Sequence, residues 1–112
     1  RDDAPVLVTV PSFALHGIDA VRCERELAAF MVTLANRTRT ASELLAGVST
    51  RGAQALHRAC RARAYVHGRD YVVPDDVRAL LVPTWAHRLV TRDGGPAAAM
   101  LHEILADTPL PE

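Results

Sequence analysis

Apolar side chains recur at the spacing of a helix in residues 24–39. They lie three or four residues apart, which places them in one stripe and predicts an amphipathic helix. The stripe consists of Leu27, Phe30, Met31 and Leu34. Glutamates occupy the first turn and arginines the last, as the helix dipole favours, and they set the limits at about Glu24 and Arg39.

A second helix is predicted from Ser49 or Thr50, either of which can cap it, to about Tyr65. A linker ending at Val48 precedes it, and Gly68 is expected to end it. Its buried stripe is made mostly of small residues, so the helix can approach its neighbours closely. These residues are Ala53, Leu56, Cys60 and Ala64.

Prolines divide the rest of the chain. Pro74 is a favoured first residue of a third helix, whose positive end Asp75 and Asp76 complement. Pro83 is expected to break this helix, with a further turn or two behind it. Pro96 is expected to start the last helix. The residues expected to face inward are Val77, Leu80, Leu81, Leu101, Ile104 and Leu105.

Residues 1–22 show no helical pattern. Val6, Val8 and Val10 alternate there, while Pro11 and Gly17 argue against a long helix. We therefore expect an extended arm or interdomain connector over residues 1–22 and a helical domain over residues 23–112. The predicted fold class is all-α, a small helical bundle with short extended segments at most.

Composition narrows the class of protein. The 112 residues suit a single domain, and the formal net charge is zero, so nothing global draws the chain to nucleic acid or to an anionic membrane. No apolar run approaches the ~20 residues of a membrane span, and no signal-peptide pattern is present. Cys23 and Cys60 are too few for a disulfide scaffold. We expect two reduced thiols in a cytoplasmic protein, although a single bridge stays open. The chain begins abruptly at Arg1, which suggests a fragment or a processed chain.

Four motifs in order resemble the C-terminal lid of MoxR-type AAA+ ATPases. They are Thr-Arg at 38–39, Gly-Val-Ser-Thr-Arg-Gly at 47–52, Gly-Arg-Asp-Tyr-Val-Val-Pro-Asp-Asp-Val at 68–77, and His-Arg-Leu at 87–89. Thr50 stands where the family usually has proline, Val73 where it has threonine, and Trp85 where it has an aliphatic residue. The change at Val73 removes a side-chain cap, which costs about 0.5–2 kcal/mol if nothing replaces it.

The resemblance implies that Arg51 is the sensor 2 arginine, which points from the lid toward the γ-phosphate of ATP bound in the large domain. The first turn of a capped helix favours an anion independently of this. A plain solvated arginine at a helix start is the alternative. The intact protein is then expected to bind ATP and Mg²⁺, to form a ring of subunits and to act in a chaperone-like manner. A von Willebrand factor A-domain protein is a candidate partner.

The parts that bind and activate ATP are missing from these residues. All thirteen basic residues are arginine, so no lysine can contact the β- and γ-phosphates, and no Gly-x-x-x-x-Gly-Lys-Ser/Thr loop is present. No acidic strand end is available for Mg²⁺. We therefore expect the parent protein to be an ATPase, this chain alone not to be catalytic, and no residue of it to be a catalytic one.

Other kinds of site have weaker support. His57 and Cys60 can share a helix face, but two ligands do not make a zinc site. Asp75 and Asp76 resemble an acid/base pair, yet their place at a helix start explains them by the dipole. Neither Cys23 nor Cys60 has an evident base that would make it a nucleophile.

The arginines on the second helix and just after it leave nucleic-acid binding open as an alternative. They are Arg58, Arg61, Arg63 and Arg69. A small helical DNA-binding or histone-fold-like module is therefore the alternative function, although zero net charge speaks against it. We expect these arginines to line an interface with the ATPase domain or a neighbouring subunit, with a plain solvated face nearly as well supported. A free-standing adaptor is a third possibility.

Overall fold

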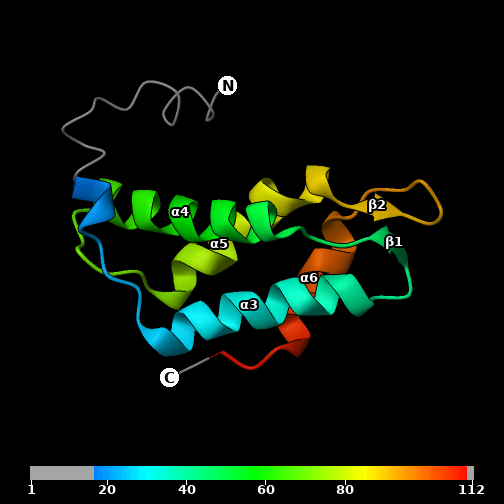
Figure 1. Ribbon diagram of the computed structural model, residues 1–112, viewed down its shortest axis with the longest axis horizontal. Coiled ribbons are helices and arrows are strands. Elements are labelled where there is room, and N and C mark those ends of the chain that lie inside the picture. Colours follow the sequence, from blue (N-terminus) through cyan, green and yellow to red (C-terminus); the bar gives the residue numbers. More distant parts are fainter. Residues whose placement is uncertain (1–16, 111–112) are drawn as a thin grey trace.

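The computed structural model describes residues 17–110, and these form a small helical domain (Figure 1). The helices are α3 (Arg25–Thr40), α4 (Thr50–Val66), α5 (Pro74–Trp85), the 3₁₀ helix η1 (Ala86–Arg88) and α6 (Ala98–Asp107). The strands are β1 (Leu44–Ala46) and β2 (Val90–Thr91). The prediction of an all-α bundle with short extended segments is confirmed.

The two long helices α3 and α4 run in opposite directions, with α5 between them and α6 crossing behind (Figure 1). Helix α4 packs mainly on α5, and α6 contacts both α3 and α5. Each α-helix contributes a fully buried leucine to the common core: Leu34, Leu56, Leu81 and Leu101. Trp85 at the end of α5 is also fully buried. The centre of the core is therefore built from the predicted stripes, and Trp85, Val48 and Val72 from outside the stripes complete it.

The predicted inward residues fall into two groups. Those that are buried are Leu27, Phe30, Met31, Leu34, Leu56, Cys60, Ala64, Val77, Leu81 and Leu101. Those that are only partly buried and pack at the edge of the core are Ala53, Leu80, Ile104 and Leu105. Helix α4, whose buried stripe consists mostly of small residues, contacts α5 more than any other helix.

A two-stranded sheet joins the loops at one end of the bundle. Strand β1 pairs antiparallel with β2, with Leu44 opposite Thr91 and Ala46 opposite Val90. The sheet lies just before α4 begins (Figure 1). It ties the linker after α3 to the segment after η1, and it thereby limits how far the start of α4 can move.

Pro83 does not break the third helix. It lies inside α5, which continues to Trp85, and the prediction of a break there is wrong. Proline removes one backbone donor, but Pro83 is exposed and close to the helix end, where little of the hydrogen-bond ladder remains. The ladder resumes behind it, since the Ala86 N–H donates to the Val82 carbonyl. Burial of Trp85 anchors this last turn.

The last helix begins two residues later than predicted, at Ala98 rather than Pro96. Side chains hold the preceding residues in a turn: the Thr91 hydroxyl donates to the Gly95 carbonyl at 2.7 Å, and Asp93 accepts from the Gly95 N–H at 2.8 Å. Pro96 therefore belongs to the turn and not to the helix.

Part of the predicted N-terminal arm lies against the domain. Val6, Val8 and Val10 fall outside the described residues, but Ile18 and Val21 are buried, and Val21 belongs to the core. Backbone bonds fix the next residue, because the Arg22 N–H donates to the Asp70 carbonyl at 2.8 Å. Residues 18–22 are thus bound to the segment between α4 and α5.

Candidate functional site

Arg51 lies in the first turn of α4, where the sequence places it. The Ser49 hydroxyl caps the helix by accepting the Gly52 N–H at 3.1 Å, which settles the cap as Ser49 rather than Thr50. The Arg51 side chain is exposed. Arg51 therefore brings a permanently charged side chain to a helix start, and this combination suits an anion.

The first turn of α4 is anchored from α5. The Trp85 indole N–H donates to the Gly52 carbonyl at 2.9 Å, and this bond is buried. A Cβ on Gly52 would lie 3.0 Å from Val48 Cγ1 and 3.4 Å from Arg88 Cδ, so the turn is also tightly packed. This bond was not predictable from local sequence patterns, in which the unusual tryptophan at position 85 is the one visible sign.

Most arginines of the described chain are engaged inside the domain. Those that make no side-chain hydrogen bond or ion pair with another residue of 17–110 are Arg25, Arg51 and Arg58. Arg51 is the member of this group that lies at a capped helix start. It is therefore a cation available to a ligand or partner outside the described residues.

Three of the four arginines that we expected at an interface serve the domain itself. The Arg61 Nε–H donates to the Val21 carbonyl at 3.2 Å, and Arg63 and Arg69 bind Asp76. Arg58 is exposed and matches the expectation of a surface residue. Arg61, Arg63 and Arg69 thus have acceptors within the domain, and an interface role for the four arginines stays a prediction.

Asp76 is the centre of a buried charge network. Its carboxylate is fully buried and lies 2.6 Å from the Arg63 guanidinium and 2.8 Å from that of Arg69. The Val73 N–H donates to its other oxygen at 2.9 Å, which is the arm of a capping box that needs no side-chain acceptor at Val73. Burial raises the pKa of this carboxyl, but the hydrogen bonds from Arg69, Val73 and Arg63 outweigh burial and hold the pKa below its usual value.

The helix dipole thus explains only one of the two acidic residues at the start of α5. Asp75 is exposed and pairs with Arg78 one turn on, as a residue at a helix start can. Asp76 instead joins α4, the following loop and α5. An acid/base pair is not formed, since the two carboxylates face different partners.

The profile of the AAA lid domain family matches residues 34–108. This chain is an AAA lid domain. The uncharacterised protein YeaC of Bacillus subtilis is 33% identical over 104 residues, which cover 88% of this chain and 32% of YeaC. The protein MoxR of Paracoccus denitrificans is 58% identical over 43 residues, 38% of this chain and 13% of that protein.

A solved structure has the same fold. The crystal structure of a candidate ATPase from Cytophaga hutchinsonii superposes with a TM-score of 0.81 at 26% identity, over 87% of this chain and 34% of that one. The predicted resemblance to the lid of a MoxR-type AAA+ ATPase is therefore confirmed. The lid spans about a third of the length of YeaC and of the Cytophaga protein.

The thiols of the lid are not set up for catalysis. Both cysteines are free. Burial, with smaller effects from Asp76 and Cys23, raises the pKa of the Cys60 thiol to about 12, and burial also raises that of Cys23. A thiol held in its neutral form is a poor nucleophile.

Metal binding finds no support in the described part of the lid. Within residues 17–110, no group of three or more His, Cys, Asp or Glu side chains is arranged to hold an ion. His57 is half-buried, and burial together with the nearby Arg61 lowers its pKa.

Within residues 17–110, no helix has both the length and the apolar character that crossing a bilayer requires.

A shallow hollow of about 460 Å³ lies at the far end of α4 from Arg51. Its walls come from residues 17–21 and 65–71, among them Tyr65, Arg69 and Tyr71. Helix α4 has 17 residues and is about 25 Å long, so the hollow and Arg51 are separate features of the lid.

Proposed function

We propose that this lid places Arg51 against a phosphate of the nucleotide that the large domain of its parent AAA+ ATPase binds, as a sensor 2 arginine. The supporting observation is that Arg51 is exposed, has no side-chain partner among residues 17–110 and stands in a capped first turn.

The γ-phosphate is the group that changes between ATP and ADP, and a guanidinium binds phosphate through a planar pair of donors. ATP draws Arg51, and α4 with it, toward the large domain. Hydrolysis removes the attraction and lets the lid turn back. Because α4 packs on α5 and α3, the whole bundle follows the motion of this one helix.

ATP and Mg²⁺ are held by the large domain in this proposal. The lid fits that role as a contributor: it offers one free guanidinium and helix N–H groups to a phosphate, and its sequence has no lysine for a P-loop. This lid on its own does not hydrolyse ATP.

The lid is similar to that of MoxR. We propose that its parent protein works as a cytoplasmic ring of subunits with a chaperone-like action on other proteins. The large domain of the same chain and the neighbouring subunits are the first partners of the lid. A von Willebrand factor A-domain protein is proposed as the further partner of the ring.

The test is Arg51→Ala in the intact ATPase, with Arg58→Ala as the matched control. Arg58 lies two turns further along the same face of α4, about 10 Å away, and is also exposed and unpaired within residues 17–110. ATP turnover should fall about tenfold or more for Arg51→Ala, because one charged contact to the transition state is worth about 1.4 kcal/mol or more. It should be unchanged for Arg58→Ala.

Arg51→Lys separates charge from geometry. Lysine keeps the positive charge but loses the planar fork, so its turnover should lie between those of the wild type and Arg51→Ala. Turnover of Arg51→Ala equal to that of Arg58→Ala would refute the sensor role.

A further inference from the structure

We propose that Thr38 and Arg39, at the end of α3, are positioning residues that fix the place and direction of Arg51. This inference rests on the proposed phosphate contact of Arg51. Neither residue touches the phosphate itself. Both act through Val48, the residue just before the cap of α4.

The two side chains hold both backbone groups of Val48. The Val48 N–H donates to the Thr38 hydroxyl at 2.9 Å, and the Arg39 Nε–H donates to the Val48 carbonyl at 2.7 Å. Thr38 is fully buried and Val48 almost so. The chain therefore enters α4 from a point whose donor and acceptor are both bound to α3.

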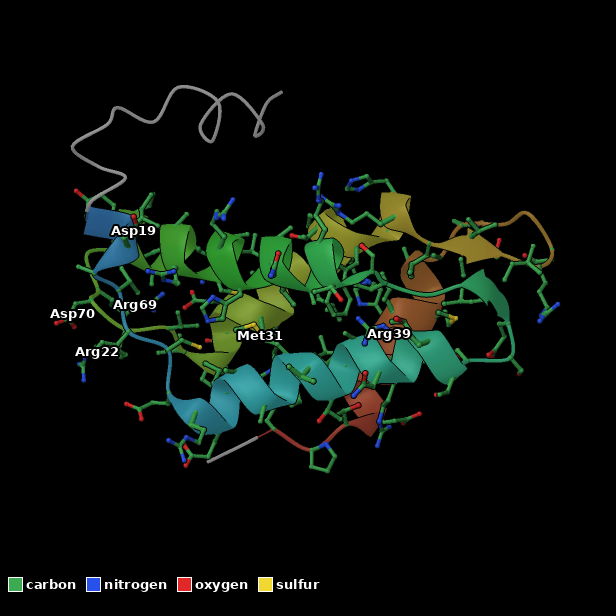
Figure 2. All side chains as sticks on the ribbon, in the orientation of Figure 1. Asp19, Arg22, Met31, Arg39, Arg69 and Asp70 are labelled. Carbon is green, nitrogen blue, oxygen red and sulfur yellow. The ribbon has the colours of Figure 1, made fainter. Side chains whose placement is uncertain are left out.

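Each clamping side chain is itself held in place. The Thr38 hydroxyl donates to the Ala35 carbonyl at 2.6 Å, so its lone pair is directed at the Val48 N–H. The Arg39 guanidinium also donates to the Asn36 side chain at 2.8 Å. In Figure 2, Arg39 lies on the side of α3 that faces the segment leading into α4.

Gly47 shows how close this contact is. A Cβ on Gly47 would come within 2.7 Å of backbone atoms of Thr38 and Arg39. Backbone atoms cannot yield as a flexible side chain can, so only glycine permits the approach. The loop before α4 is thus pressed against the end of α3.

The hydrogen bonds of Thr38 and Arg39 to Val48 have a counterpart on the other side of Arg51. Thr38 and Arg39 hold Val48, three residues before Arg51, and Trp85 holds the carbonyl of Gly52, one residue after it. The Arg51 backbone is thus fixed from α3 on one side and from α5 on the other. The side chain swings from a fixed base, which limits where its guanidinium can reach.

Placement at this accuracy matters for turnover. A shift of about 1 Å in a group that orients the reacting atoms can cost about a hundredfold in rate. Loosening Val48 should therefore lower ATP turnover even though Arg51 is intact. The Thr-Arg pair at residues 38–39, one of the motifs shared with the family, then has the role of positioning Arg51.

The first experiment measures ATP turnover of the intact ATPase carrying Thr38→Val, with Thr40→Val as the matched control. Valine matches the shape of threonine but leaves the Val48 N–H without an acceptor. Thr40 is two residues away and exposed, and its hydroxyl is directed only at carbonyls of its own helix. We expect a fall of about tenfold for Thr38→Val, recovery for Thr38→Ser, and no change for Thr40→Val.

Arg39→Met provides a variant that does not disturb the core. Methionine keeps an aliphatic stem but removes the donor to Val48, and Arg39 is exposed, so folding should be preserved. Turnover should fall by about the same factor as for Thr38→Val. An unchanged turnover in a folded Arg39→Met protein would overturn the positioning role of Arg39.

A double-mutant cycle with Arg51→Ala distinguishes positioning from a merely structural effect. If Arg39 acts through Arg51, Arg39→Met should change turnover by less than about twofold once Arg51 is already alanine. A full additional loss in that background would overturn the inference. A loss for Arg51→Ala with none for Arg39→Met leaves the sensor role standing and removes the positioning role; no loss for Arg51→Ala removes both.

Discussion

Replacing Asp76 by asparagine tests whether the charge network at the start of α5 holds the lid together. Within residues 17–110, Asp76 is the one carboxylate that is fully buried. It accepts hydrogen bonds from the Arg63 and Arg69 guanidinium groups and from the Val73 N–H. Asparagine has the same shape but no charge. Its NH₂ group would also place a hydrogen-bond donor opposite the N–H donors of a guanidinium, where the carboxylate had an acceptor. Two cationic side chains would then lose their counter-ion.

The expected cost follows from the exposure of the partners. Breaking a buried ion pair by removing one partner costs about 3–5 kcal/mol. The Arg63 and Arg69 side chains are 30% and 21% exposed, so water can take over part of their solvation, and we expect the lower end of that range. For a domain of this size, a loss of about 3 kcal/mol lowers the melting temperature by on the order of 10–20 °C.

The measurement is thermal unfolding of the 112-residue chain followed by circular dichroism, with Asp75→Asn as control. Asp75 precedes Asp76 in the same turn, but it is exposed and pairs only with Arg78 one turn on. An exposed pair contributes little, so this variant should melt within about 3 °C of the wild type. Equal melting temperatures for the two variants would show that the network does not stabilise the lid.

Three further predictions concern the same core. The pKa of Asp76 is lowered in the folded lid, so its stabilising effect is complete above pH about 4, the ordinary pKa of the group, and is lost as the pH falls through the folded pKa. The difference in the free energy of unfolding between wild type and Asp76→Asn, measured by acid titration, should therefore narrow toward pH about 2. A constant difference would contradict this. Trp85→Phe removes the indole donor to Gly52 and leaves a small void, so urea unfolding should show a loss of about 2 kcal/mol, whereas an unaltered midpoint would mean that the bond contributes nothing. The Cys60 thiol, whose pKa is about 12, should stay unreactive toward a disulfide reagent at pH 8 in the folded lid and react at once in denaturant; rapid labelling of Cys60 in the folded state would contradict its burial.

Local signals in the sequence predicted the elements that depend on nearby residues. The helices α3 and α4 have their predicted limits to within one residue, because their apolar stripes, the Ser49 cap and the glycine at residue 68 all act within a turn or two. The motif order over residues 38–89 also identified the family. Arg51 entered as a candidate from its motif and its place in a helix, which are both local properties.

Features that depend on residues distant in the sequence could be seen only in the tertiary structure. Pro83 stays inside α5 because the buried Trp85 anchors the turn behind it. The two acidic residues at the start of α5 look alike in sequence, yet only Asp76 meets arginines from α4 and the following loop.

The sequence by itself predicted the all-α class, the limits of α3 and α4 and the family, and it singled out Arg51 as the candidate for a phosphate contact. The tertiary structure alone decided which arginines of residues 17–110 are paired inside the domain and which have no partner there. It also decided that Thr38 and Arg39 of α3 bind the backbone of Val48. The physical reason is range: helix periodicity and caps are written in residues three or four apart, whereas the direction of a buried hydrogen bond depends on where another helix comes to lie.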